Sequence, residues 1–453
     1  MEEEHPEETM ITGRFEPGSP DWIPLEFEVP AGIGSITVEY SYDRPEPPRG
    51  LPSNACDIGI FDPERFRGYS GGARSWFRLG DTAVTTPGYL AGPIPAGTWQ
   101  LLLAPYTVVP DGLHYQVRIR FENGPDGAER TRSYAPTEAT GRGRAWYRGD
   151  LHTHTVHSDG KRTLAELATD AHAAGLDFVV STEHNTNAAH RELGEHAGDD
   201  LLILNGEEVT TRNGHLVAAG LTDDCWVDWR FRATDDRLRD VLDTIHQQHG
   251  LAIAAHPHAP CLGCQWKFGY AGLDAVEVWN GPWTPDDEVS LQQWNSMLVN
   301  PDGSWIPAVG SSDSHTESDP VGLAQTVVLA DRLSREAILA GIRAGRCYVT
   351  GSSQVELDFT ASAAEQVYGI GDRLALPEDS PVRIRLSVRG VTEGVVRFVT
   401  DEGWAAVLDL PPEGVVEWTT TPAVSSYVRA EVRTPGPPFF EPMAAFTNPI
   451  FLR

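Results

Sequence analysis

Short apolar runs alternate with longer runs of helical spacing through the middle of the chain, and this alternation limits the possible folds more than any other feature. "LDFVVST" and "LAIAAHP" have the length and apolar character of buried strands. The runs 163–175 and 236–250 carry apolar residues at helical spacing and end in glycine. Thr163 and Glu166 also match a capping box. Strands that alternate with helices predict a parallel sheet or barrel.

The sequence on either side of this region has a different period. "SITVEYSY" and "YQVRIRFE" before it, and "VRIRLSV" and "GVVRFVT" after it, are β-patterned, as is typical of strands in sandwiches. We therefore expect an α/β protein whose central barrel lies between an N-terminal and a C-terminal β-sandwich. The expected boundaries are an acidic tail (1–10), a β-sandwich (11–123), a linker (124–145), the barrel (146–353) and a second β-sandwich (354–453).

Nearly every expected strand of the middle region ends in a histidine or a carboxylate. "GDLHTH" places Asp150, His152 and His154 at alternate positions, so a strand would point all three to one face. The later strand ends carry Glu183, His184, Glu207, Glu208, His215, His256, Glu277, Asn280, Asp313 and His315. In a (β/α) barrel these ends converge on the face where active sites lie. Because imidazole and carboxylate bind Zn, Mn and Fe ions, the sequence predicts a metal site there.

Five of these motifs, in this order, resemble the polymerase and histidinol phosphatase (PHP) superfamily, and within it the carbaryl-hydrolase-like CehA/McbA metallohydrolase branch. They are "GDLHTHTVHSDG", "VVSTEHNT", "NGEEVTTRNGHL", "AHPH" and "GSSDSH". The resemblance covers about Trp146 to Gly351. It implies a distorted (β/α)7 barrel that holds two or three divalent metal ions.

The resemblance also implies which side chains hold these ions. The ligands of a first ion would be His152, His154 and Asp313. The ligands of a second ion would be Glu208, which bridges it to the first, with His215 and His256. The ligands of a third ion would be Asp159, His184 and His315.

Three residues beside these ligands are candidate catalytic residues, namely Asp150, His157 and Glu183. We expect Asp150 to orient one of the first two histidines, and His157 to support the site or face solvent. The family usually has aspartate before the histidine of the second motif, where this chain has Glu183. Because glutamate is one methylene longer, this departure affects the third ion most.

The motifs favour a metal-dependent hydrolase that acts on a small phosphate ester with metal-activated water. A carbamate or carboxylic-ester hydrolase is the alternative, with an aromatic pocket formed by Trp226, Trp229, Trp266, Trp279 and Trp283. A lesser alternative is a catalytically inactive metal-binding module between two β-sandwiches.

Charge and hydropathy exclude other classes of function. A formal net charge of −30 argues against binding long nucleic acids or an anionic membrane surface. No apolar run reaches the roughly 18 residues of a spanning helix, and "MEEEHPEETM" is not a signal peptide. Five scattered cysteines suit a reducing compartment, so we expect a cytoplasmic protein in which Cys261 and Cys264 are a loop thiol pair. The sequence gives no indication of the oligomeric state.

Overall fold

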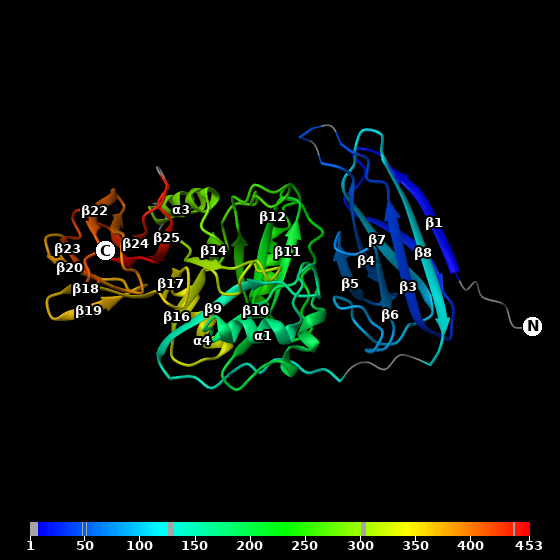
Figure 1. The fold of residues 1–453 in the computed structure, drawn as a ribbon, viewed down its shortest axis with the longest axis horizontal. Helices are drawn as coiled ribbons and strands as arrows, with labels where there is room; N and C mark the ends of the chain where they lie inside the picture. Colours follow the sequence, from blue (N-terminus) through cyan, green and yellow to red (C-terminus); the bar gives the residue numbers. More distant parts are fainter. Residues whose placement is uncertain (1–7, 48, 51, 126–130, 300–304, 438–439) are drawn as a thin grey trace, which may run out of the picture. The chain divides into compact units, whose positions relative to one another are not determined.

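A computed structural model describes residues 8–47, 49–50, 52–125, 131–299, 305–437 and 440–453 (Figure 1). It divides into two compact units. The N-terminal unit comprises Met1–Tyr134 together with two short loops from later in the chain, Thr155–Gly160 and Glu183–Glu192. The C-terminal unit comprises the remaining residues. No helix among the described residues is long and apolar enough to span a bilayer.

The N-terminal unit is built from two antiparallel sheets of four strands each. The first has the order β1 (Glu8–Phe15), β8 (Leu113–Asn123), β3 (Ile33–Tyr42) and β6 (Trp76–Leu79). The second has the order β2 (Ile23–Val29), β7 (Gly97–Thr107), β4 (Ala55–Phe61) and β5 (Phe66–Gly71). Side chains from both sheets form one hydrophobic core, which contains Val38 and Trp99. Residues 8–10, which we expected in the acidic tail, belong to β1.

The two loops in this unit follow strands of the other unit. Residues 155–160 come after β9 (Ala145–Thr153), and residues 183–192 come after β10 (Phe178–Ser181). The second loop contains the 3-10 helix η1 (Ala188–Arg191). Both loops carry residues of the predicted metal site.

The C-terminal unit begins as a run of seven neighbouring strands. Their order is β15 (Ala308–Ser311), β14 (Ala275–Asn280), β13 (Leu251–Ala255), β12 (Gly214–Ala219), β11 (Leu202–Thr211), β10 and β9. Within this run, β12 is antiparallel to both of its neighbours, and the other pairs are parallel. The two ends of the run meet, because Asp313 N donates to His152 O at 2.9 Å and His154 N donates to Ser314 O at 3.0 Å.

The described residues form four α-helices, α1 (Leu164–Ala173), α2 (Leu238–Gln247), α3 (Pro285–Leu298) and α4 (Arg335–Arg343). The helix expected at 163–175 is confirmed, since Thr163 and Glu166 form a capping box at the start of α1. Strict alternation of strand and helix is not observed, however. Only Arg212 and Asn213 separate β11 from β12, and two residues make a hairpin rather than a helical crossover. A complete (β/α)7 pattern would place a helix between these two strands, where the described residues form none.

The sheet continues beyond β9 into the C-terminal part of the chain. The added strands are β16 (Gln325–Ala330), β17 (Cys347–Thr350), β25 (Met443–Thr447), β24 (Tyr427–Arg433), β21 (Val395–Thr400) and β22 (Gly403–Asp409), and β26 (Ile450–Phe451) pairs with β24. A separate sheet has the order β19 (Gln366–Gly369), β18 (Glu356–Ala363), β20 (Val382–Arg389) and β23 (Val415–Thr420). The pairing of β17 with β25 joins residues 354–453 to the central sheet.

Candidate metal centre

The end of β9 brings two histidines to the same buried face. His152 and His154 alternate along the strand, and neither side chain is exposed. The Nε2 atoms of both lie near Asp313 Oδ1, at 3.3 Å from His152 and 3.1 Å from His154. They also lie 3.3 and 3.4 Å from Glu208 Oε2. Two carboxylates from distant strand ends therefore face the histidine pair.

Glu208 also contacts a second pair of histidines through its other oxygen. Its Oε1 lies 2.8 Å from Nδ1 of His215 and 3.2 Å from Nε2 of His256. The β11–β12 hairpin brings His215 beside Glu208 by pairing it with Thr210. His256 follows directly after the end of β13. The Glu208 carboxylate thus joins two clusters of donors, as a bridging metal ligand would.

These donors fit a metal ion in chemistry and in spacing. A tetrahedral site with bonds near 2.0–2.1 Å has donor–donor distances of about 3.3–3.4 Å, which the contacts of the first cluster approach. Nε2 of His152 and Oδ1 of Asp313 are buried and have no hydrogen-bond partner among the described residues. The groups His152–His154–Asp313 and His152–Glu208–His256 each offer three donor atoms close enough to hold one ion.

The electrostatics of the cluster are those of closely packed opposite charges. Burial alone would lower the pKa of His152, but Asp313, Glu208 and Glu277 together raise it well above its usual range. Burial would raise the pKa of Asp313, whereas His152 and His154 lower it well below its usual range. The Asp313 carboxylate is therefore held ionised, in the form that binds a metal.

The backbone is strained at two of the candidate ligands. His256 has φ of +25° and Asp313 has φ of +50°, in the region that non-glycine residues rarely adopt. Strain of this kind persists where the surrounding structure fixes a side chain for a function. His256 directly follows the short strand β13, and Asp313 lies two residues after the short strand β15, so the bend turns their side chains into the site.

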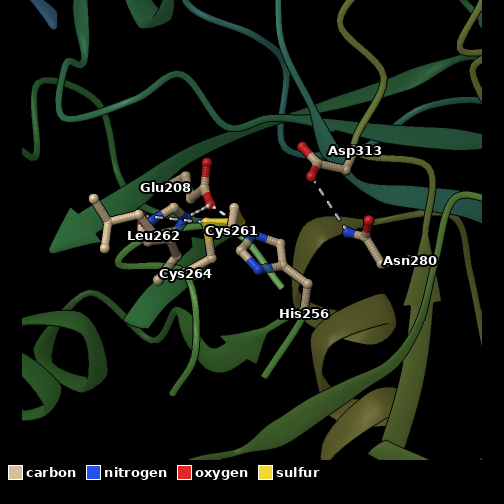
Figure 2. Close-up of a disulfide and its surroundings, with 8 residues drawn as sticks. Glu208, His256, Cys261, Leu262, Cys264, Asn280 and Asp313 are labelled. Carbon is tan, nitrogen blue, oxygen red and sulfur yellow. Dashed lines mark hydrogen bonds and ion pairs between the residues drawn. A yellow bond between two sulfur atoms is a disulfide. The ribbon is translucent and has the colours of Figure 1, made fainter. Parts of the chain in front are cut away.

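Glu277 on β14 supports the site, a role that the sequence did not reveal. Its Oε1 lies 3.3 Å from Nδ1 of His152, and its Oε2 accepts a 2.7 Å hydrogen bond from the backbone N–H of His256. Asn280 donates to Glu277 Oε2 at 3.0 Å. Figure 2 shows its second contact, in which it donates to Oδ2 of Asp313 at 3.5 Å. The sequence indicated only that Glu277 and Asn280 lie near the end of one strand, and it did not indicate which residues they contact.

Asp150, which we expected to orient one of the two histidines, accepts a hydrogen bond from the backbone N–H of His152 at 3.3 Å, and the described residues show no hydrogen bond between its carboxylate and an imidazole. Its carboxylate accepts hydrogen bonds from the Ser312 hydroxyl at 2.5 Å, from Ser312 N at 3.0 Å and from Gly322 N at 2.8 Å. Burial raises the pKa of Asp150 to about 6, although these hydrogen bonds oppose the shift. Asp150 therefore holds the loop that carries Asp313 in place, because β9 directs the Asp150 side chain toward that loop.

The predicted ligands of a third ion are divided between the units. In the N-terminal unit, Nε2 of His184 lies 3.5 Å from Oδ1 of Asp159. In the C-terminal unit, the His315 ring stacks on that of His154 at 4.1 Å, and its Nδ1 lies 2.7 Å from the carbonyl oxygen of Asp313. A third ion shared by Asp159, His184 and His315 stays a prediction.

Glu183 joins the two loops of the N-terminal unit. Its carboxylate accepts hydrogen bonds from the Thr155 hydroxyl at 2.6 Å, from Thr155 N at 3.2 Å and from the Ser158 hydroxyl at 2.6 Å. Nδ1 of His157 lies 3.2 Å from the Thr155 hydroxyl, and its Nε2 lies 3.8 Å from Glu192. His157 is buried, so it supports the loops rather than facing solvent.

Cys261 and Cys264 form a disulfide in the loop that follows His256, so the expected free thiol pair is wrong. Figure 2 shows this disulfide together with Glu208 and His256. Two of the tryptophans proposed for an aromatic pocket, Trp229 and Trp279, are only 2% exposed and belong to the hydrophobic core. Their burial indicates a packing role.

Comparison with known proteins finds similarity to a PHP-associated family over a small part of the chain. The family model described as PHP-associated matches residues 305–347, the segment that carries Asp313 and His315. An uncharacterized protein from Methanocaldococcus jannaschii is 27% identical over 148 residues, which cover 29% of this chain and 81% of that protein.

Two solved structures show weaker similarity. One is a two-domain protein from Bacteroides vulgatus containing a predicted PHP-like metal-dependent phosphoesterase, with 17% identity, a TM-score of 0.38, and coverage of 68% of this chain and 96% of that chain. The other is an amidohydrolase from Chromobacterium violaceum, with 18% identity, a TM-score of 0.30, and coverage of 38% of this chain and 89% of that chain. Such TM-scores identify neither the fold nor the activity of this chain.

Proposed function

We propose that this protein is a metal-dependent hydrolase of the PHP superfamily, in its CehA/McbA branch, and that it cleaves a small phosphate ester. The observation that carries the proposal is the convergence of three histidines and two carboxylates, His152, His154, Glu208, His256 and Asp313, on two joined donor clusters. In this proposal the seven strands from β9 to β15 form a distorted barrel, with the site at the carboxyl ends of the parallel strands and the amino end of β12.

In the proposed site, His152, His154 and Asp313 hold one divalent ion, and His215 and His256 hold a second. Glu208 bridges the two, since each of its oxygens faces a different histidine pair. Asp159, His184 and His315 hold a third ion. Such ions supply Lewis-acid polarisation of the substrate and activation of water at neutral pH.

The chain's own residues prepare the site for this chemistry. Glu277 fixes the His152 ring and the backbone at His256, so the donors are held in place before an ion or substrate binds. Burial of the histidine pair keeps bulk water away from the reacting groups. A small substrate agrees with the net charge of −30, which would repel a long polyanion.

Metal content and hydrolysis should be measured on the same purified protein. We expect two or three divalent ions per chain, and release of phosphate from p-nitrophenyl phosphate that stops on chelation and returns on adding metal back. The double variant His152→Ala/His154→Ala should lose both the ions and the activity, because it removes two donors of the first cluster. Glu336→Gln, at an exposed position on α4, is the matched control.

Parallel assays with p-nitrophenyl acetate separate the two hydrolase classes. Cleavage of the acetate alone would replace the phosphoesterase with a carbamate or carboxylic-ester hydrolase. Bound metal without either activity would favour the inactive binding module. A chain without bound metal, whose rates are unchanged in the double variant, would overturn the proposal.

A further inference from the structure

One residue of the N-terminal unit, in a turn between β6 and β7, touches both loops that carry predicted ligands of the third ion. Gly88 has φ of +92°, and a Cβ atom added to it would lie 2.2 Å from the carbonyl oxygen of His157. Its own carbonyl accepts a 2.8 Å hydrogen bond from the hydroxyl of Thr186. His157 belongs to the loop of Asp159, and Thr186 to the loop of His184. Only glycine allows so close an approach at this φ.

Side chains of β5 and β6 hold the segment around Gly88 in place. The buried guanidinium of Arg67 donates through Nε to the carbonyl of Leu90 and through Nη1 to Oδ2 of Asp62 at 3.1 Å. The Tyr89 ring stacks on Phe77 at 4.2 Å, and its hydroxyl lies 2.7 Å from that of Ser70. A segment fixed on both sides can hold the loops that pack on it.

Two further contacts hold the same loops from other directions. The guanidinium of Arg74, which lies between β5 and β6, donates to the carbonyl of Val156. The backbone N–H of Ser133 donates to the carbonyl of Arg191 at 2.8 Å. Since Glu183 ties the loops to each other, the four contacts constrain them as one body.

We propose that the N-terminal β sheets position Asp159 and His184 for metal binding, and that Gly88 is the residue on which this positioning depends. The inference rests on the proposed function, because it assigns the sheets a role at the third ion. The sheets order the two loops before an ion binds. Asp159 and His184 therefore lose less conformational freedom when the ion binds. Loss of such support typically weakens metal affinity roughly 10- to 100-fold.

Gly88→Ala tests the proposal, with Gly32→Ala as its control. Both glycines have positive φ, +92° and +85°, but a Cβ at Gly32 would meet nothing within 4 Å. The two variants therefore share the backbone strain, and only Gly88→Ala displaces a loop. Metal content by mass spectrometry and hydrogen exchange of residues 155–160 and 183–192 should be measured on the full chain.

We expect Gly88→Ala to bind about one ion fewer per chain than Gly32→Ala and to exchange faster within the two loops. If Gly88→Ala does not fold, Thr186→Val removes the hydroxyl that donates to Gly88 and should change the same two measurements in the same direction. A variant that matches Gly32→Ala in both measurements would overturn the positioning role alone.

The metal content of the unmodified chain separates the two proposals. A chain that binds no ion would overturn the proposed function, and with it the role of the sheets at the third ion. A chain that binds two ions and is otherwise active would leave the hydrolase intact and overturn the positioning of a third.

Discussion

Glu277 is the residue that connects otherwise separate parts of the candidate centre. With Nε2 of His152 turned toward the carboxylates, Nδ1 is assigned the proton that Glu277 accepts. The second oxygen of Glu277 accepts from the backbone N–H of His256. Burial would raise the pKa of Glu277, but His152 and His256 lower it below its usual range. Three donors face the Glu277 carboxylate, so no neutral side chain of the same shape can accept hydrogen bonds from all of them.

Glu277→Gln should weaken metal binding by roughly 10- to 100-fold. The amide places its NH2 group either against His152 Nδ1–H or against both His256 N–H and the Asn280 amide, so at least one contact becomes repulsive. Affinity is measured by competition with a chelator of known strength.

Glu336→Gln, a change of the same charge in an exposed ion pair with Arg332, should leave metal affinity unchanged. Equal affinities for the two variants would show that Glu277 does not support the centre.

At the scale of the element, α3 begins in a capping box whose acid is buried. Asp287 Oδ2 accepts from Thr284 N at 2.7 Å, and Oδ1 accepts from Asn280 N at 3.0 Å. Burial raises the pKa of Asp287 to about 7, although these hydrogen bonds oppose the rise. The cap therefore fixes the start of α3 and the end of β14 together.

The free energy of unfolding of the metal-free protein should fall, relative to Asp287→Asn, as the pH rises from about 4 to about 7. An unfolded aspartate ionises near pH 3.9, so between these values the folded state holds a proton that the unfolded state has lost. The stabilisation is complete below the pKa of the unfolded state and is lost above the pKa of the folded state. It amounts to about 1.4 kcal/mol for each unit by which these two pKa values differ. Urea unfolding across this range measures it.

Asp243→Asn, at an exposed position on α2, should keep the pH dependence of the unmodified chain. The raised pKa would be contradicted if Asp287→Asn changed stability by the same amount at every pH.

At the scale of the whole molecule, one buried amide fastens the C-terminal strands to the central sheet. Asn448 Nδ2 donates to the carbonyls of Ala308 and Cys347 at 2.9 Å, and its Oδ1 accepts from Ala308 N at 2.9 Å. Ala308 begins β15, the strand that leads to Asp313. The C-terminal strands thus contribute to the position of a candidate ligand.

Asn448→Ala should lower the free energy of unfolding by about 1–3 kcal/mol for each buried group left without a partner. Chemical denaturation measures this loss, and Asn123→Ala, an exposed asparagine at the end of β8, should stay within about 0.5 kcal/mol. A loss no larger than that of the control would mean that packing alone holds the C-terminal strands.

Local sequence patterns predicted features that depend on residues close together in the chain. The capping box and the buried face of α1 were predicted because the partners lie three or four positions apart. His152 and His154 were placed on one face because alternate residues of a strand share a face.

Only the tertiary structure decided contacts between distant residues. The partner of His152 is Glu277, 125 positions away, and the position of Asp150 is fixed by Ser312. The two ligand loops group with the N-terminal sheets, which no periodicity predicts. Periodicity reports which face a side chain takes on its own element, whereas sheet order and side-chain packing between elements determine what that face meets.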